Sequence, residues 1–468
     1  MISPVKKSPW FLLVLVVYFG VATLFAVYTP AWQSPDEPAH YNYVSQVAAN
    51  GCCPVIEEGD WDSDYLEQLK SNRFNPALLG NLHRVQYEDH QPPLYYLVAA
   101  PLFRVTNGTL LALRLFSVLI GEVIVISAAF IAQALLPQRP WIAAGTAAFV
   151  AFLPQKVHIL ASVNNDALAW AFIALTLLLT ILYLKGQRQW QIPIVSLAIP
   201  LPWILGLLVG LALLTKATTY FLVAVVLLAI FWRWRDRYVP TSITDKAVFK
   251  PLLQHGLQFL LPAIFLGSLW WLRNLSVYGL PDFLGLQAHD RVVIGQLRTA
   301  DYIGQVGWLD YLTNLVRTTF ISFWGQFGWM ALPLSGRPLW VVGGLVVAVV
   351  SGWIIRLVVK GPDREIGKSE RRPIIWILGF TFILTMAAYI GYNLEFLQFQ
   401  GRYLYAGLIP IALFLVLGLE GWGHLLARLT ATPQYRPYFY WLAISPLLLL
   451  PLLDIYILLR IIVPGLTP

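Results

Sequence analysis

Two adjacent carboxylates flanked by prolines are the residues best placed for acid–base chemistry in this sequence. Asp36 and Glu37 lie between Pro35 and Pro38, and His40 follows four residues after Asp36. Residues four apart share a helix face, and a carboxylate beside a histidine near an apolar surface is a common setting for a general base. Alternatively, Asp36 caps a helix that has Pro38 in its first turn. Capping explains one carboxylate but not the pair, so both interpretations stay open.

A second polar cluster precedes a pair of prolines. Glu88, Asp89 and His90 are followed by Pro92 and Pro93 and then by an apolar, aromatic run. One interpretation is a turn anchored by tyrosines at the membrane interface. The other places the three polar residues at the rim of an outer cavity. Together with the Asp36 region, the cluster favours the cavity.

Asp166 opens an apolar run and follows Asn165. An acidic residue in a first turn after an asparagine cap is ordinary helix chemistry. A carboxylate at the membrane edge that faces a helix bundle is nevertheless costly, and function is the usual reason for keeping one there. Asp166 is therefore a candidate catalytic residue, with helix capping as the alternative.

Three cations lie at the ends of apolar runs, where a membrane protein would meet the outer headgroups. They are Lys216, Arg273 and Arg402, and Tyr403 follows the last of them. Snorkelling of the long side chains to the headgroups would explain each one singly. Arginine also binds phosphate oxygens through its two-pronged guanidinium. Two or three such cations would suffice to hold a lipid-linked phosphate.

The composition defines the class of protein that positions these residues. The chain has 468 residues, of which 58% are hydrophobic and 12% charged, with a mean hydropathy of +0.66. Soluble domains carry about 25% charged residues, so a soluble or disordered chain is excluded. Two cysteines exclude a disulfide-rich scaffold; Cys52 and Cys53 are adjacent and are expected to be free thiols. The net charge of +8 is spread over short segments and does not indicate a nucleic-acid partner. We therefore predict an all-α polytopic membrane protein.

A membrane span needs about 20 mostly apolar residues. Eleven segments are predicted to cross: 10–28, 111–136, 141–160, 166–184, 193–214, 217–232, 256–272, 338–359, 373–392, 403–422 and 438–463. Residues 92–104 are too short to cross and indicate a re-entrant or interfacial helix. An amphipathic stretch at 36–49 is predicted to lie along the outer interface.

The distribution of lysine and arginine predicts the orientation. With the N-terminus in the cytoplasm, the inner segments contain 17 basic and 5 acidic residues, whereas acidic residues outnumber basic ones outside. Two large outer loops result, at about 29–110 and about 273–337. The first carries the interfacial helices. All the candidate residues then lie on the extracytoplasmic side.

In their order along the chain, these motifs resemble the polytopic GT-C class of glycosyltransferases, which take a sugar from a polyprenyl phosphate. The class includes protein O-mannosyltransferases and the lipid A aminoarabinose transferase, and the likeness is to bacterial multi-pass members of the cell envelope. The resemblance is carried by Asp36-Glu37 with His40, by His90-Gln91-Pro92-Pro93-Leu94-Tyr95-Tyr96, by Asn165-Asp166, by Lys216, by Arg273-Asn274 and by Gln400-Gly401-Arg402-Tyr403. It implies one GT-C transmembrane domain over residues 1–468, in the plasma (inner) membrane, without a soluble C-terminal domain.

The resemblance also implies roles for the candidate residues. A first-loop carboxylate acts as catalytic base in such enzymes, which corresponds to Asp36 or Glu37, and a second acidic residue of the same cavity corresponds to Asp166. Basic residues hold the donor phosphate. The expected substrate-binding residues are His40, Glu88, Asp89, His90, Lys216, Arg273, Arg402 and Tyr403.

The chemistry expected at such a site is a single displacement with inversion. The acceptor hydroxyl attacks the anomeric carbon while the base removes its proton, and cations stabilise the departing phosphate. No cofactor or metal is required if those cations suffice, although a divalent ion on Asp36 and Glu37 is an open alternative. The expected partners are a polyprenyl-phosphate-linked sugar, the bilayer, and a glycan, lipid or protein acceptor.

Two other classes of protein compete with the enzyme. A transporter or flippase of lipid-linked sugars would place ionisable residues near the bilayer midplane, where Glu122 and Asp454 fall within predicted spans. A scaffold without chemistry would leave the acidic loop residues scattered in water. A cavity open only to the outer side would favour the enzyme.

Overall fold

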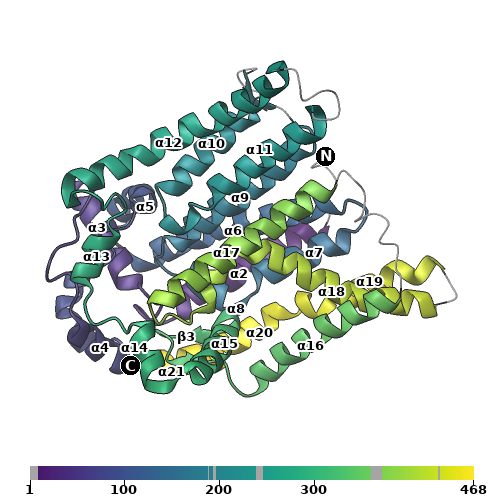
Figure 1. Ribbon diagram of the computed structural model, residues 1–468. Helices are drawn as coiled ribbons and strands as arrows, with labels where there is room; N and C mark the ends of the chain where they lie inside the picture. The colour runs from purple at the N-terminus through teal and green to yellow at the C-terminus, as the bar shows by residue number, and fades with distance from the viewer. Residues whose placement is uncertain (1–8, 188, 193–196, 239–245, 360–370, 431–432) are drawn as a thin grey trace.

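Helices make up most of the computed structural model, which describes residues 9–187, 189–192, 197–238, 246–359, 371–430 and 433–468 (Figure 1). The strands of the described part form two short antiparallel pairs. In one, β1 (Gln189–Ile192) pairs with β2 (Leu197–Pro200); in the other, β3 (Gln326–Phe327) pairs with β4 (Leu332–Pro333). Gln189 lies opposite Pro200, and Gln326 opposite Pro333.

Nine helical segments of the described chain are long and apolar enough to cross a membrane, which confirms the predicted all-α multi-pass protein. Six are single helices: α2 (Pro9–Tyr28), α6 (Leu110–Leu135), α9 (Asp166–Leu184), α12 (Lys250–Tyr278), α16 (Arg337–Val358) and α17 (Arg372–Glu395). The other three each consist of several consecutive helices. The span Ala217–Arg237 is formed by η2 (Ala217–Thr219) and α11 (Leu222–Tyr238), and the span Gly401–Leu429 by η6 (Gly401–Gly407) and α18 (Leu408–Leu429). The span Arg436–Leu466 is formed by α19 (Arg436–Leu448), α20 (Leu450–Ile457), η8 (Leu458–Ile462) and α21 (Val463–Leu466).

The predicted count of eleven spans is not confirmed, because two segments differ from the prediction. Residues 141–160 form α7 (Pro140–Ala151) and α8 (Pro154–Leu160), bent by 59° where Pro154 interrupts the hydrogen-bond ladder. In the segment 193–214, residues 193–196 lie outside the described part, β2 follows, and α10 (Leu201–Leu213) has only 13 residues. The predicted short helix at 92–104 is α5 (Leu94–Val105).

Both predicted outer loops contain helices. The first has α3 (Glu37–Asn50), α4 (Ser63–Ser71) and η1 (Pro76–Arg84); the second has α13 (Leu286–Val292), α14 (Thr299–Val306) and α15 (Trp308–Trp324). The predicted amphipathic stretch is α3, whose Tyr43 ring stacks on Tyr96 of α5 with centroids 3.6 Å apart. Cys52 and Cys53 are joined by a disulfide in the structure, so the expectation of free thiols is wrong.

The helices pack as two groups around a shared core, and the loops gather at one end. In Figure 1, α10, α11 and α12 lie together on one side, and α16, α18 and α19 on the other. The core helix α6 packs against α2, α7 and α9, and α18 packs against α7, α16 and α19. The loop helices α3, α4, α13 and α14 lie at the same end of the bundle in Figure 1, so polar residues far apart in the sequence meet there.

Candidate functional site

A cavity of about 740 Å³ lies among the loops and the neighbouring helix ends. Its wall comes from the first loop, the start of η2, the region around α13, the end of α17 and η6. Seven of the predicted site residues line it: Asp36, His40, Glu88, His90, Lys216, Arg402 and Tyr403. The fold therefore brings together residues separated by more than three hundred positions.

Asp36 precedes α3 and faces the cavity. Its Oδ2 accepts a hydrogen bond from Nη2 of Arg402 at 2.7 Å, and its Oδ1 accepts one from the Tyr87 hydroxyl at 2.9 Å. Its backbone is left-handed, with φ of 66°, and its side chain makes no capping hydrogen bond, so the capping interpretation is wrong. Burial alone would raise the pKa of the Asp36 carboxyl, but Arg402 and the two hydrogen bonds outweigh burial and hold that pKa below its ordinary value.

Glu37 lies beside Asp36 in sequence but does not line the cavity. It is fully buried, and its two oxygens accept hydrogen bonds from Nε and Nη2 of Arg114 in α6, at 2.8 and 2.7 Å. The backbone N–H groups of Trp32 and Val163 also donate to it, at 3.0 and 3.2 Å. Glu37 thus connects the first loop to the helical core.

Asp166 does not line the cavity but is bonded to Lys216, which does. Nζ of Lys216 donates to Oδ1 of Asp166 at 2.7 Å and to Oδ1 of Asn165 at 2.9 Å. Lys216 lines the cavity, whereas Asp166 and Asn165 do not. Asn165 occupies the N-cap position of α9, as the sequence predicted, but its side chain makes no capping hydrogen bond; the Asn164 side chain instead accepts one from the backbone N–H of Asp166 at 2.8 Å. Asp166 therefore orients the ammonium group of Lys216.

His40 is held in a neutral hydrogen-bonded position on the cavity wall. Its Nδ1 lies 2.8 Å from the Tyr96 hydroxyl, which also accepts a hydrogen bond from the Asn165 amide at 3.3 Å. Burial, and then the charge of Lys216, lower the pKa of His40 to about 3. At neutral pH the imidazole can thus contribute hydrogen bonds but no charge.

The three polar residues of the second cluster do not all reach the cavity. Glu88 and His90 line it, while Asp89 points away and accepts a hydrogen bond from Nε2 of Gln46 at 2.7 Å. Burial, and then the charge of Asp36, raise the pKa of Glu88 to about 7. The ring centroid of His90 lies 4.3 Å from that of His289, which lies in the middle of α13.

Arg273 is not part of the cavity wall. Its Nη2 donates to the carbonyls of Cys53 and Pro54, at 3.2 and 2.5 Å, and its guanidinium lies 4.8 Å from the ring of Trp270. These contacts fasten the first loop to α12. The predicted set of three phosphate-binding cations is thus reduced to Lys216 and Arg402 at the cavity.

Arg402 has hydrogen-bonding capacity that the described protein does not use. Nη2 donates to Asp36, but the buried Nε and Nη1 atoms have no hydrogen-bond partner among the described residues. The adjacent Tyr403 also lines the cavity, with its ring centroid 5.4 Å from the guanidinium. Because buried donors are normally bonded, Nε and Nη1 leave Arg402 with unused capacity for a further acceptor.

Sequence reasoning missed the two residues that fix the carboxylates. Tyr87 donates to Asp36, and Arg114 binds Glu37. Arg114 carried a usable signal, because a charge within an apolar run needs a partner. The alternative of a divalent ion shared by Asp36 and Glu37 does not fit this arrangement, since both Glu37 oxygens are bonded to Arg114.

Comparisons with known proteins show similarity in sequence profile and in fold. A profile of the dolichyl-phosphate-mannose-protein mannosyltransferase family matches residues 55–270. The crystal structure of ArnT from Cupriavidus metallidurans in the apo state is similar, with a TM-score of 0.50 and 14% identity over 98% of this chain and 72% of that one. The same protein bound to undecaprenyl phosphate gives a TM-score of 0.48 and 14% identity over 98% and 74% of the two chains. No curated protein matches the sequence. The chain has the GT-C fold, and the predicted resemblance to that class is confirmed.

Proposed function

We propose that this membrane protein is a glycosyltransferase that moves a monosaccharide from a polyprenyl-phosphate donor to an acceptor hydroxyl. The GT-C fold supports this, as does the matching family profile, whose description contains a dolichyl-phosphate sugar. The observation that carries the proposal is Arg402, which pairs with the cavity carboxylate Asp36, has two donor atoms without partners among the described residues, and lines the same cavity as Lys216.

The donor phosphate binds to Arg402 and Lys216 in this proposal. Nε and Nη1 of Arg402 are buried and have no partner among the described residues, so in this proposal the guanidinium turns towards the cavity to donate to the phosphate oxygens, and the Lys216 ammonium, oriented by Asp166, adds a second positive charge. Asp166 is then a positioning residue. A bound phosphate that shares the Arg402 guanidinium with Asp36 would raise the pKa of Asp36 and strengthen it as a base when the donor is present.

The reaction proceeds as a single displacement with inversion. The acceptor oxygen forms a bond to the anomeric carbon, and its proton passes to the carboxylate of Asp36. The bond between the anomeric carbon and the phosphate oxygen breaks, and its electron pair remains on the phosphate, where Arg402 and Lys216 stabilise the charge. The Tyr87 hydroxyl, bonded to Oδ1, keeps the carboxylate in position.

Under this proposal the protein lies in the plasma (inner) membrane, with its N-terminus in the cytoplasm and the cavity on the extracytoplasmic side. The excess of basic residues in the predicted inner segments supports that orientation. The gathering of the loop helices at one end of the bundle is compatible with it (Figure 1). The cavity wall draws on those loops and on helix ends, which favours an enzyme over a flippase.

The test uses purified protein in lipid nanodiscs with a panel of radiolabelled polyprenyl-phosphate sugars and a crude acceptor extract. The wild type should release one label into water-soluble or acceptor-bound form, and Asp36→Asn should not. Asp310→Asn, which alters an exposed loop carboxylate, is the matched control and should behave as the wild type. Retention of every label by folded wild-type protein would contradict the proposal. Label movement across reconstituted vesicles would then identify a flippase.

A further inference from the structure

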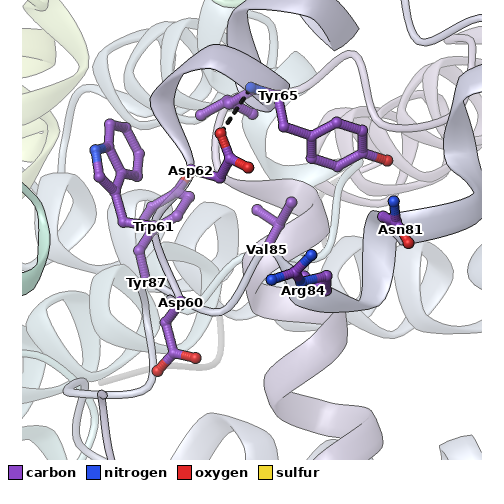
Figure 2. A pocket seen from close by; sticks show the side chains of 9 residues that line it. Asp60, Trp61, Asp62, Tyr65, Asn81, Arg84, Val85 and Tyr87 are labelled. Atoms are coloured by element: carbon purple, nitrogen blue, oxygen red, sulfur yellow. Dashed lines mark hydrogen bonds between the residues drawn. The ribbon is translucent and has the colours of Figure 1, made fainter. Parts of the chain in front are cut away.

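A second, smaller hollow adjoins the main cavity on the first outer loop. It has a volume of about 60 Å³ and is formed around α4 and η1. In Figure 2, the rings of Trp61 and Tyr87 lie on one side of it, the Tyr65 ring, Asn81 and Arg84 lie on the other, and Asp62 lies between them. Trp61, Leu66 and Tyr87 line both hollows, so the two are separated by one shared wall.

The polar groups of this outer hollow include exposed donors that bind no other residue of the described chain. The Arg84 guanidinium and the Asn81 amide are exposed and have no hydrogen-bond or ion-pair partner within the described ranges. Asp62 accepts a hydrogen bond from the Tyr65 backbone through Oδ1, which leaves Oδ2 to accept another. The hollow therefore offers both donors and an acceptor over a short distance.

The aromatic side of the hollow is held rigidly. The rings of Trp61 and Tyr87 meet edge to face, with centroids 5.2 Å apart. Nε1 of Trp61 donates to the carbonyl of Ile294 in the second loop at 3.0 Å. Tyr87 is buried and bonded to Asp36. A fixed apolar wall opposite unpaired polar groups suits a ligand with one apolar and one polar face.

We propose that this outer hollow binds a saccharide part of the acceptor and directs the acceptor hydroxyl towards Asp36. The assignment of this saccharide as acceptor rests on the proposed glycosyltransferase function. Each sugar hydroxyl both donates and accepts hydrogen bonds, which matches the mixture of Arg84, Asn81 and Asp62. The C–H face of a sugar ring can lie against Trp61.

The charges of the outer hollow argue against other ligands. Asp60 and Asp62 would repel a phosphate, and Arg84 is the single cation among the residues that line the hollow. Extended peptides are commonly bound by main-chain pairing along a sheet edge, whereas helices and turns surround this hollow. A neutral saccharide satisfies the donors without adding charge.

The position of the hollow places the ligand beside the reacting groups. The Tyr87 ring forms part of the shared wall, and its hydroxyl donates to Oδ1 of Asp36 at 2.9 Å. A saccharide seated against Trp61 and Tyr87 would extend its next residue over this wall into the main cavity. The acceptor would thus approach from the loop side, opposite the lipid-borne donor.

Ligand-observed NMR on the full-length protein in nanodiscs tests the proposal directly. Methyl α-glucoside and maltotriose are the saccharide probes, and a threonine-containing hexapeptide is the comparison. Saccharide binding should weaken about fivefold in Arg84→Ala and in Asn81→Ala, the loss typical of one hydrogen bond. It should be unchanged in Arg317→Ala, which removes an exposed arginine of α15.

The outcomes separate this proposal from the proposed function. Asp36→Asn should abolish sugar transfer yet retain saccharide binding, because Asp36 lies across the wall from the hollow. If the wild type binds saccharide but transfers no sugar, the proposed glycosyltransferase function is contradicted, whereas the proposed saccharide site is supported. Absence of saccharide binding, equal binding in all variants, or Arg84-dependent binding of the peptide alone would overturn the site.

Discussion

Two clusters of buried charge show how differently one membrane protein can use the same residue types. In the second half of α18, Glu420 is fully buried and accepts hydrogen bonds from Arg139 and Arg356, each at 3.0 Å, and from Nε1 of Trp141 at 2.7 Å. At the loop end, Asp36 is bonded to Arg402 at 2.7 Å, and both line a cavity. Both clusters pair a carboxylate with arginine within an apolar protein.

The difference lies in unused hydrogen-bonding capacity and in access. Glu420 receives donors from several elements and does not line the main cavity. Arg402 keeps two buried donors without partners among the described residues and faces open volume. Burial of a charge in a membrane protein is therefore no indication of chemistry by itself. A buried charged residue that lines a cavity and keeps unused hydrogen-bonding atoms is a better indication of chemistry.

The largest expected effect comes from Asp36→Asn. Loss of the general base should lower kcat/KM for sugar transfer by about 10²- to 10⁴-fold. The thermal unfolding midpoint should fall, because the buried Arg402 loses its counterion, but by less than in Glu420→Gln, since the Asp36 side chain is 21% exposed at the cavity. Radiolabel transfer and unfolding are measured on the same preparation. Undiminished transfer would remove Asp36 from the mechanism.

Glu420→Gln should produce the reverse pattern. Removal of the charge breaks the buried ion pairs that Glu420 makes with Arg139 and Arg356, and breaking a buried pair by removing one partner typically costs about 3–5 kcal/mol of stability. Unfolding in detergent should occur at a much lower temperature, while kcat per folded molecule stays unchanged. A variant with normal unfolding and reduced kcat would break the distinction between the two clusters.

Arg402→Lys is expected to have a smaller effect on donor binding. Lysine retains the positive charge but cannot supply the paired donors of guanidinium. Affinity for the polyprenyl-phosphate donor should fall about tenfold, equivalent to losing one charge-assisted hydrogen bond. Equilibrium binding of a fluorescent donor analogue measures this change. Arg317→Lys serves as the control, and equal affinities in the two variants would exclude Arg402 from phosphate binding.

The smallest expected effect is the pH dependence that Glu88 contributes. Burial raises its pKa to about 7 from an ordinary value of 4.5, so the folded state retains a proton that the unfolded state releases. The free energy of unfolding should therefore fall as pH rises through this window. Glu88→Gln should flatten that part of the profile of unfolding midpoint against pH, whereas Asp310→Asn should not. An identical slope in Glu88→Gln and wild type would contradict the assignment.

Much of the fold follows from local properties of the chain. Runs of about 20 apolar residues are sufficient to indicate spans, and nine described segments bear this out. The differences occur where proline acts within or beside a run: Pro154 separates α7 from α8, and Pro200 and Pro202 accompany the late start of α10. Average hydropathy does not register such breaks, because proline alters backbone hydrogen bonding rather than polarity.

The candidate site depends on contacts that local patterns do not encode. Residue type and spacing alone indicated that Asp36, Glu37 and the outer cations could do chemistry. They could not decide which carboxylate reaches the cavity, because that choice is made by Arg114, 77 positions from Glu37, and by Arg402, 366 positions from Asp36. Adjacent residues at the start of a helix point in different directions, and only the packing of distant elements determines which of them meets open volume.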